Sequence, residues 1–505
     1  NLVIQSLLLI TNFANMNDLK VGISAVTAYV PPYRVDLQKW CSWSEKSWEK
    51  INHVIGSGFR ILGPNQSIYT MAANAVLKLI ESYNINPSDI GFLALGTESS
   101  TDNSAGSVII KGMVNNELKK RKLNPIAKNC EVPEFKQACL SGIYAVKNAV
   151  RFLKSDAPGS KAIVVCSDNA LYPVGTRGEP TQGAGAVAVL IEADPQIAEV
   201  HTNLSGSASD YRLIDFRKPI HYRAKNGDEA SDFNLDLPIF NSKYSSTCYI
   251  DQTINALTDM SKKRGLKTID YLKEIPVIFM HRPFHKMPIT AFTIVYLHAL
   301  SDGNRDDLNE LSSYAKSADV VFDDLLNELK TRPNISDYPL NDNIQHEPLP
   351  LAQAVSKICQ KNKNFQAKVL NKLNFGNNLT REMGNIYSGS VFGWFAAGLN
   401  DAIDQEIDWT NQEGLLFGYG SGDAAEVIPI RFVENWKEAA FKAKFSNTFL
   451  DSYDLSKEEY RSLRTQKKSN GIDHKLKNQF IVEKIGTEER DDFQDAGIEY
   501  YQYLS

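Results

Sequence analysis

The sequence lacks the cysteine patterns of two large classes of protein. Its 505 residues include only six cysteines, spread from Cys41 to Cys359, and no two of them form a CxxC pair. This spacing argues against a disulfide framework and against a structural zinc site, so we expect no metal. Scattered cysteines without a disulfide framework are typical of a reducing compartment, and the sequence therefore predicts a cytoplasmic protein.

A strong charge of either sign is also missing. The 55 Lys and Arg residues nearly balance the 60 Asp and Glu residues, which leaves a formal charge of -5. Such a chain has no overall attraction to nucleic acid or to an anionic membrane surface, so neither is expected as a partner. The apolar run at residues 289–300 is shorter than the roughly 20 residues that a membrane span needs.

The first residues are apolar but have neither a basic segment nor a small-residue cleavage motif. Because Met16 stands just before the first strand-like run, we interpret residues 1–15 as a leader or a cloning remnant. Beyond them, the 43% hydrophobic and 23% charged residues are typical of globular proteins. The length alone would allow roughly three ordinary domains.

Short β-branched runs alternate with stretches of helical period, which indicates an α/β fold. The runs at 90–95 and 161–166 are almost continuously apolar and end at polar loops, as buried strands do where open sheets site their chemistry. A similar rhythm returns at 275–280, 290–299 and 415–418. It predicts a duplicated fold, with polar surface excursions at 217–240 and 301–350.

Cys139 is the first candidate for chemistry, because it stands directly before the helix-period stretch 143–153. The positive end of a helix dipole lowers the pKa of a thiol, which would make Cys139 a nucleophile. A free cysteine is also among the most commonly buried and inert residues, and that alternative stays open.

Two further candidates follow buried strands. His281 comes after the run 275–280, and Pro283 ends the strand so that the imidazole is presented at its end. Glu98 follows the run 90–95, where partial burial would raise the pKa of its carboxyl toward neutrality. The alternatives are a structural histidine, with His285 as competitor, and a solvated loop carboxylate.

Asn385 and the glycine-rich turn at 418–422 offer an amide and closely spaced backbone N–H groups, which could stabilise an oxyanion. Two ordinary glycine-rich turns with no role in catalysis would give the same sequence pattern, and this alternative stays open. The candidates share one property, which is that most lie at the ends of predicted buried strands, and one pocket could therefore collect them.

Together, these segments resemble the 3-hydroxy-3-methylglutaryl-CoA synthase family of the thiolase superfamily. The strings GEPTQGAGAV (178–187), HRPFHKM (281–287) and GYGSG (418–422) carry the resemblance, with FKQACLSG (135–142) around the cysteine. It covers the chain from about Lys20 to the C-terminal end. It implies a duplicated five-layered αβαβα core, with halves at 16–200 and 201–435 and an extension at 436–505 packed on the core.

The resemblance also implies a ping-pong Claisen-type condensation of acetyl-CoA with acetoacetyl-CoA, on the route to mevalonate. Cys139 would accept the acetyl group, Glu98 would remove a proton from its methyl, and His281 would protonate and stabilise the alkoxide. The remaining implied roles are positioning of the acceptor by Asn385, an oxyanion hole at Cys139 and Ser421 beside Gly420, and contact of Lys286 with the phosphates of CoA. No permanently bound cofactor is implied, and a homodimer is expected.

Residues 140–144 depart from the family pattern, since Leu140 replaces an aromatic residue and Ile143 and Tyr144 replace small ones. This leaves the acyl pocket and the acceptor open. The nearest alternative is a polyketide β-branching synthase that uses substrates bound to an acyl carrier protein. A non-catalytic binding partner of the same fold is a third possibility, and a decarboxylating ketosynthase is disfavoured because it would not need Glu98.

Overall fold

The computed structural model describes residues 19–100, 103–215, 218, 237–239, 241–336, 347–466, 472 and 474–505. The predicted leader at 1–15 lies outside the described residues, as do most of the polar excursion at 217–240 and the loop residues 337–346.

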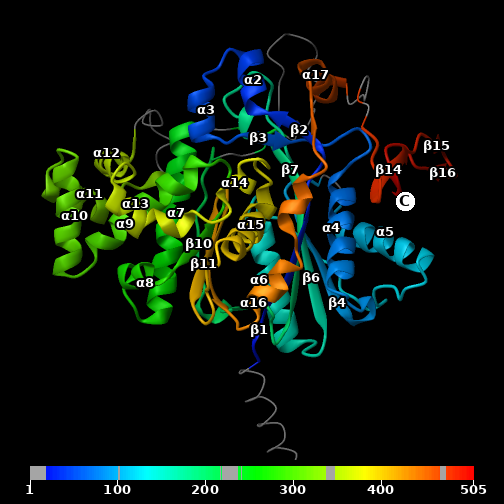
Figure 1. Ribbon diagram of the computed structural model, residues 1–505, viewed down its shortest axis with the longest axis horizontal. Coiled ribbons are helices and arrows are strands. Elements are labelled where there is room, and N and C mark those ends of the chain that lie inside the picture. Colours follow the sequence, from blue (N-terminus) through cyan, green and yellow to red (C-terminus); the bar gives the residue numbers. More distant parts are fainter. Residues whose placement is uncertain are drawn as a thin grey trace, which may run out of the picture.

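A ten-stranded mixed sheet forms the centre of the molecule, in the order β10-β11-β12-β8-β1-β7-β6-β4-β5, with β9 paired to β12 (Figure 1). The strands of the first half are β1 (Val21–Tyr29), β4 (Ile90–Gly96), β5 (Glu134–Phe135), β6 (Lys161–Ala170), β7 (Gly183–Ala193) and β8 (Ala198–Val200). Those of the second half are β9 (Gly206–Ser209), β10 (Val277–Met280), β11 (Glu413–Gly420) and β12 (Ala424–Phe432). The predicted α/β class is confirmed. The runs at 90–95, 161–166 and 415–418 fall in strands, and the run at 275–280 becomes strand β10 from Val277 onward.

Helices lie in three layers around the sheet. Helices α4 (Ile68–Ser82) and α5 (Gly106–Lys120) cover the outer face of the first half, while α7 (Ser242–Arg264) and α9 (Lys286–Ser301) cover that of the second. Between the halves lie α6 (Ser141–Ser155) and α15 (Ser390–Asp404). Helix α6 packs against strands of the first half, whereas α15 packs mainly against β10 and also contacts β11, β1 and β7. Each half of the continuous sheet forms one β layer, so the layer order is αβαβα, as predicted.

The period-two pattern of β6 shows why the layers form. Ala162, Val164 and Cys166 belong to the core around α6 and α15, whereas Ile163 and Val165 belong to the core beneath α4 and α5. Successive side chains of a strand point to opposite faces, so a continuously apolar strand fills two cores at once.

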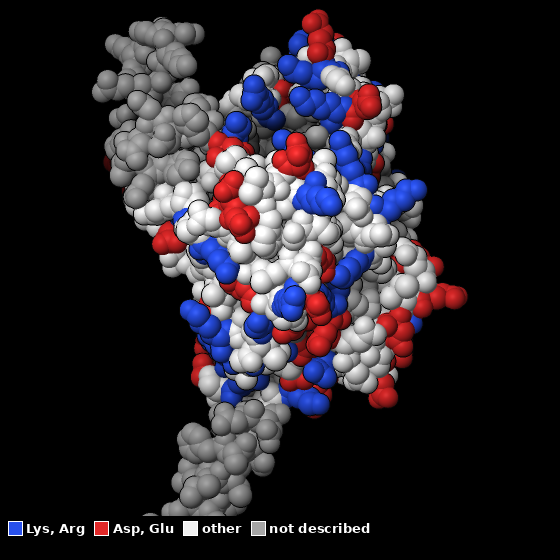
Figure 2. Space-filling view, turned by 90° about the vertical axis from the view of Figure 1, so that its left-hand side faces the viewer, with Lys and Arg blue, Asp and Glu red and all other residues white. Residues whose placement is uncertain are grey.

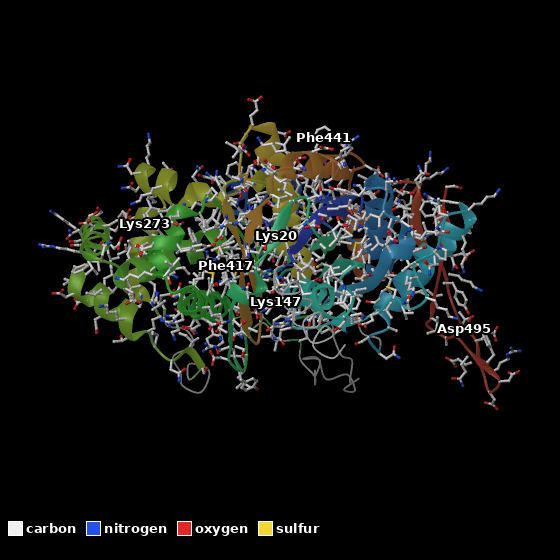
Figure 3. The ribbon with its side chains drawn as sticks, turned by 90° about the horizontal axis from the view of Figure 1, so that it is seen from below. Lys20, Lys147, Lys273, Phe417, Phe441 and Asp495 are labelled. Atoms are coloured by element: carbon white, nitrogen blue, oxygen red, sulfur yellow. The ribbon has the colours of Figure 1, made fainter. Side chains whose placement is uncertain are left out.

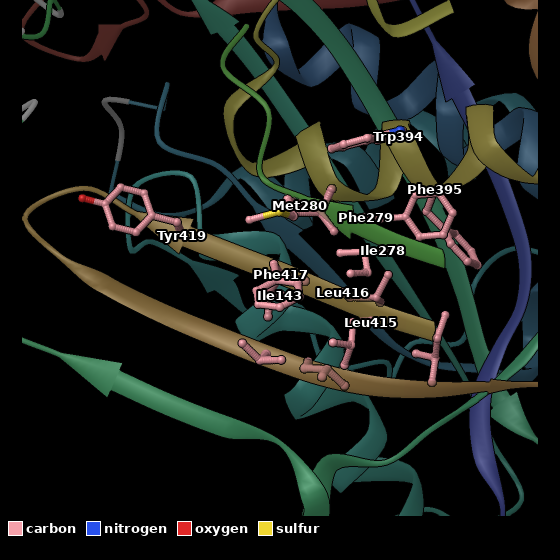
Figure 4. Close-up of a cluster of buried hydrophobic side chains, with 14 of the residues drawn as sticks. Ile143, Ile278, Phe279, Met280, Trp394, Phe395, Leu415, Leu416, Phe417 and Tyr419 are labelled. Atoms are coloured by element: carbon pink, nitrogen blue, oxygen red, sulfur yellow. The ribbon is translucent and has the colours of Figure 1, made fainter. Parts of the chain in front are cut away.

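The core of the second half is rich in aromatic contacts. The side chains of β10 and β11 pack beneath α15, where the ring of Phe279 meets Trp394 and Phe395 edge-on at centroid distances of 6.2 and 5.4 Å (Figure 4). This dense packing fixes the carboxyl ends of β10 and β11, where His281 and the turn after Gly420 begin.

The two halves are joined within the sheet and by a buried ion pair. Strand β8 pairs with β1 on one side and with β12 on the other. Lys147 of α6 and Glu426 of β12 form a buried ion pair at 2.7 Å. The division into halves thus follows chain order, while the packing is continuous.

A small layer covers one end of the sheet. It consists of α2 (Leu37–Ser44), α3 (Trp48–Val54), α17 (Lys457–Gln466) and the three-stranded sheet of β2 (Tyr33–Asp36), β3 (Gly58–Arg60) and β13 (Tyr453–Asp454). These elements share an apolar cluster of their own. They place α3, which has no buried residue, over the carboxyl ends of the central strands.

The C-terminal hairpin of β14 (Gln479–Ile485) and β17 (Glu499–Leu504) packs its base against the α4 side of the core through Phe480, Tyr501 and Tyr503. Tyr500 lies outside that cluster and donates its hydroxyl to Asp495. The tip, with β15 (Glu489–Arg490) and β16 (Phe493–Gln494), projects from the body, as the position of Asp495 shows (Figure 3).

The polar region at 301–350 supplies surface helices. It contains α10 (Arg305–Ser317) and α11 (Phe322–Thr331), which pack on α9 together with α12 (Pro350–Cys359). The remaining α-helices of the described residues are shorter: α8 (Thr268–Glu274), α13 (Lys363–Lys368), α14 (Asn377–Thr380) and α16 (Trp436–Phe441). On this side of the molecule, positive and negative side chains are interspersed (Figure 2). Among the described residues, no helix is long and apolar enough to cross a membrane.

Candidate active site

A cavity of about 750 Å³ opens beneath α3 at the carboxyl ends of the central strands. Cys139, His281, Asn385 and Ser421 line it, so the structure brings four of the predicted residues together. Its rim carries the exposed side chains of Lys46, Lys50 and Arg177, whereas Cys139, His281 and Asn385 are buried. A long substrate with a polar end and a reactive buried end fits this shape.

Cys139 lies on a tight turn just before α6. Its neighbour Ala138 has a φ of 44°, a left-handed conformation that is strained for a residue with a side chain. The hydroxyl of Ser141 accepts a hydrogen bond from the backbone N–H of Gln137 at 3.0 Å and so closes the turn. The sulfur is thereby held at the inner wall of the cavity.

Glu98 lies directly behind the cysteine. The Sγ atom of Cys139 donates to Oε2 of Glu98 at 3.2 Å, and the backbone carbonyl of Glu98 accepts from Nζ of Lys218 at 2.8 Å. Burial, followed by the Glu98 carboxylate, raises the pKa of the Cys139 thiol well above its usual value. The expectation of a pKa lowered by the helix dipole is therefore wrong, because burial and a neighbouring carboxylate outweigh the dipole.

Asp168 fixes the position of the Glu98 segment, and sequence reasoning missed it. Its fully buried carboxylate accepts from the backbone N–H of Glu98 at 2.9 Å, from both donors of Ser99, and from the hydroxyl of Thr97 at 2.9 Å. Its other oxygen accepts from the backbone N–H of Ser388 at 3.0 Å. One signal was present, which is the run of three polar residues at 167–169 directly after the apolar residues 162–166.

His281 enters the cavity from the end of β10. Its backbone N–H donates to the carbonyl of Phe417 at 2.8 Å, and its carbonyl accepts from the hydroxyl of Tyr249 at 2.8 Å. Burial lowers the pKa of the imidazole to about 3, so the ring is neutral. Nδ1 is buried and has no hydrogen-bond partner among the described residues.

Two tyrosines enclose the cysteine on the side of Asn385. Tyr172 and Tyr387 form a small buried cluster with Cys139 and Ala170. Burial raises the pKa of Tyr172, and hydrogen bonding with Tyr387 and Asn385 partly offsets this effect. The Oδ1 atom of Asn385 accepts from the backbone N–H of Tyr387 at 2.9 Å, which fixes the plane of the amide. The two tyrosines were not foreseen from the sequence.

The turn that follows β11 abuts the Cys139 turn. A side chain on Gly420 would place its Cβ 2.2 Å from the carbonyl oxygen of Gln137 and 3.1 Å from the backbone nitrogen of Leu140. Only glycine permits this approach, which carries Ser421 to the cavity wall.

Lys286 does not line the main cavity. It begins α9 and lines a neighbouring cavity of about 220 Å³, together with Lys243 and Glu347. Its neighbour Pro283 lines the main cavity, and Phe284 and Met287 line both cavities. Burial lowers the pKa of the Lys286 ammonium group.

A cluster of titratable groups lies beside the cavity. Potential ligand atoms of Asp215, Cys248 and Asp423 lie within 4.8 Å of one another, and all three residues are buried. Nearby protein groups interact with these carboxylates, as Arg212, Gln252 and Tyr419 all contact Asp423.

Two family models match the chain. Residues 17–196 match the N-terminal region of hydroxymethylglutaryl-coenzyme A synthase, and residues 228–478 match its C-terminal region. The hydroxymethylglutaryl-CoA synthase of Haloferax volcanii is 29% identical over 373 residues, which are 74% of this chain and 74% of the relative. That of Saccharomyces cerevisiae is 27% identical over 425 residues, covering 82% and 75% of the two chains.

Solved structures agree on the fold. MvaS in complex with 3-hydroxy-3-methylglutaryl coenzyme A is similar with a TM-score of 0.73 at 23% identity, over 96% of this chain and 100% of that one. The HMG synthase of the curacin biosynthetic pathway is similar with a TM-score of 0.67 at 19% identity, over the same shares of the two chains. The fold is thiolase-like, and the chain belongs to the hydroxymethylglutaryl-CoA synthase family.

Proposed function

We propose that the chain condenses acetyl-CoA with acetoacetyl-CoA to give 3-hydroxy-3-methylglutaryl-CoA and free CoA, through an acetyl group carried on Cys139. The observation that carries the proposal is the Cys139 thiol bonded to Glu98 in a cavity that also presents His281 and Asn385. A thiol beside a base and a neutral imidazole are the groups that a two-stage acyl transfer and condensation requires.

Acetyl transfer begins with the thiol proton. Glu98 accepts this proton along the existing hydrogen bond while Cys139 attacks the thioester carbonyl of acetyl-CoA. The raised pKa of the thiol keeps it protonated until the attack on the thioester transfers its proton to Glu98. The bond between the carbonyl carbon and the sulfur of CoA then breaks, and the proton on Glu98 passes to the leaving thiolate. Backbone N–H groups at Cys139 and Ser421 are proposed to stabilise the oxyanion.

Condensation then uses Glu98 a second time. As a carboxylate again, Glu98 removes a proton from the acetyl methyl, and the resulting carbon nucleophile attacks the keto carbon of acetoacetyl-CoA. His281 is neutral, so it can donate a ring N–H to the keto oxygen and stabilise the alkoxide as it forms. Asn385, whose amide is held by Tyr387, is proposed to orient the thioester of the acceptor. The proton held by Glu98 then passes to the alkoxide. Water hydrolyses the thioester that joins the product to Cys139, which releases the product and restores the thiol.

The charges at the rim favour a CoA thioester. Lys46, Lys50 and Arg177 are exposed around the opening, where they can contact phosphates while the acyl end reaches the buried cysteine. Glu45 lies beside them and weakens the local field. Lys286 remains a proposed phosphate contact only for a substrate arm that reaches its neighbouring cavity. Entry of the product into the mevalonate route, action in the cytoplasm and a homodimeric state complete the proposal.

The test uses acetyl-CoA labelled in its acetyl group. We expect one label per chain on Cys139, and release of labelled product only when acetoacetyl-CoA is added. The Glu98→Gln variant lacks the proton acceptor of the first stage and the base of the second, so it should become labelled slowly and should fail to condense. A wild-type protein that takes no label would overturn the proposal. Product formed only from an acetoacetyl group on an acyl carrier protein would replace it with the polyketide alternative.

A further inference from the structure

Two buried carboxyl groups meet behind the Ser421 turn. Asp423 is 4% exposed and follows Ser421 by two residues, and Asp215 is fully buried in the segment after β9. The hydroxyl of Tyr419 lies 2.5 Å from Oδ2 of Asp215 and 3.3 Å from Oδ2 of Asp423. A single phenol therefore bridges two carboxyl groups.

The number of hydrogen atoms shared by these three oxygens decides which group donates to which. A phenol carries one hydrogen, and the shorter contact indicates that Tyr419 donates it to Asp215. The contact with Asp423 then needs a hydrogen of its own, because two oxygens without one between them repel. A proton on Oδ2 of Asp423, donated to the phenol oxygen, completes a chain from Asp423 through Tyr419 to Asp215.

The neighbouring charges agree with a retained proton. Nε of Arg212 lies 3.5 Å from Oδ1 of Asp423, but the same guanidinium also pairs with Asp251 at 2.7 Å and Asp210 at 3.3 Å. Arg332 pairs with Asp251 at 2.6 Å. The carboxyl groups of Asp210, Asp251 and Asp423 thus share only the guanidinium groups of Arg212 and Arg332 among these ion pairs. Burial raises the pKa of Asp423 to about 7 against the opposing effect of Arg212.

The other groups that face the pair are neutral donors or weak acids. The Gln252 amide donates to Oδ1 of Asp423 at 3.0 Å and to Asp210 at 2.8 Å. Burial raises the pKa of the Cys248 thiol and that of the Tyr244 hydroxyl, so both stay protonated near Asp215. Burial also raises the pKa of Asp215 itself.

The pair is connected to the cavity through the backbone. The N–H of Gly422 donates to Oδ2 of Asp215 at 3.3 Å, and Asp423 exchanges two backbone hydrogen bonds with Asp210 at 2.9 and 3.2 Å. Asp215, Tyr419 and Ser421 line the cavity, and Gly420 rests on the Cys139 turn. Movement of Asp423 would therefore be transmitted to both turns.

We propose that Asp423 is a positioning residue that retains its proton and, through Tyr419 and Asp215, holds the Gly420–Asp423 turn against the Cys139 turn. Asp423 does not touch the substrate in this scheme. Its effect on the reaction rests on the proposed function, whereas its retained proton does not.

Infrared difference spectroscopy tests the proton directly. Between pH 5.5 and pH 9, wild-type protein should lose a band of a protonated carboxylic acid, and Asp423→Asn should lack that change. Asp259→Asn, which alters a carboxylate of α7 that pairs with Lys263, is the matched control and should keep it. Absence of the band in folded wild-type protein would overturn the proposal, even if the variants failed to fold. Stoichiometric Zn²⁺ binding that Asp423→Asn abolishes would also overturn it, because the metal would take the place of the proton.

Thermal unfolding gives a second measurement that needs no substrate. Because the folded-state pKa of Asp423 is raised, its stabilising contribution is complete below the unfolded pKa and is lost as pH rises through about 7. An asparagine cannot lose this donor, so the Tm of Asp423→Asn relative to wild type should rise between pH 5.5 and pH 8.5.

Activity separates positioning from a merely structural role. The ratio of Cys139 acetylation rates, Asp423→Asn over wild type, should increase about tenfold between pH 6 and pH 8.5. A ratio that is the same at every pH would overturn the positioning role. If wild-type protein is not acetylated at all, the proposed function fails, while the spectroscopic and unfolding results still decide the protonation of Asp423.

Discussion

The Sγ atom of Cys139 donates a hydrogen bond to Oε2 of Glu98 over 3.2 Å, and the carboxylate raises the pKa of the thiol. Replacing Glu98 with glutamine keeps an acceptor and removes the charge. We therefore expect the apparent pKa of Cys139 to fall, as measured by the pH dependence of its alkylation.

In the same Glu98→Gln variant, condensation should fall by about 10²- to 10⁴-fold because the general base is lost. Acetylation should slow but continue, because the lower pKa of Cys139 lets the thiol ionise without Glu98. The control is Glu117→Gln, a carboxylate of α5 that pairs with Arg121 outside the cavity. An unchanged pKa for Cys139, or condensation at the wild-type rate, would contradict the assigned role of Glu98.

Asp168→Asn should damage both stability and condensation. The amide presents two hydrogens toward donors that now converge on a carboxylate, so the Thr97–Ser99 segment would lose its anchor. We expect a decrease of about 2–4 kcal/mol in the free energy of unfolding, measured with denaturant. Asp156→Asn, at the exposed end of α6, should change it by less than about 0.5 kcal/mol. Equal effects of the two variants would argue against the anchor.

Gly420→Ala should slow acetylation more than it affects folding. The added Cβ would lie 2.2 Å from the carbonyl of Gln137, so the turn must move away from Cys139. We expect the acetylation rate, measured by labelling and quenching at set times, to be at least tenfold lower. Gly112→Ala is the control, because a Cβ there meets nothing within 4 Å. Because Gly112 lies inside a helix, alanine there should raise the free energy of unfolding by about 0.5–1 kcal/mol. A wild-type acetylation rate in Gly420→Ala would show that the two turns are not coupled.

His281 should make the protein sensitive to acid. Its folded-state pKa of about 3 lies below the unfolded value, so the unfolded chain binds a proton that the folded protein excludes. The stability is complete above the unfolded pKa and is lost as pH falls toward the folded value. Between pH 7 and pH 5 the loss from this group should reach about 2 kcal/mol.

The measurement is denaturant unfolding of wild type and His281→Gln at both pH values, where the variant should lose less stability on acidification. His298→Gln is a useful comparison, because burial lowers the pKa of His298 to about 4 and this residue stands in the last turn of α9, outside the lining of the main cavity. It should reduce the acid sensitivity as well but leave condensation intact. A His281→Gln variant with wild-type acid sensitivity would contradict a neutral, buried imidazole.

Much of the fold follows from local patterns in the sequence. The apolar runs at 90–95 and 161–166 became β4 and β6 because no strand with a solvated face could be so continuously apolar. The positions of Glu98 and His281 at strand ends followed from the polar residues and the proline that end those runs. These are signals within a few residues of the site.

Other parts of the site depend on contacts between distant segments. The cavity wall at α3 meets residues 175–181 and 283–287, and no local pattern predicts that meeting. Asp168 and Tyr387 reach the site from β6 and from the segment before α15. The pKa of Cys139 was misjudged for the same reason, since the burial and the Glu98 contact that raise it are tertiary.

The buried pair of Lys147 and Glu426 has a consequence for how the chain can be divided. Each of the two charges is supplied by a different half, and Ser207 donates a second hydrogen bond to Glu426 at 2.6 Å. A fragment ending after β8 would expose the lysine face of α6, and the complementary fragment would bury a carboxylate without its cation. The two halves named for their order along the chain are therefore one cooperative unit, and neither would be expected to survive as an independent protein.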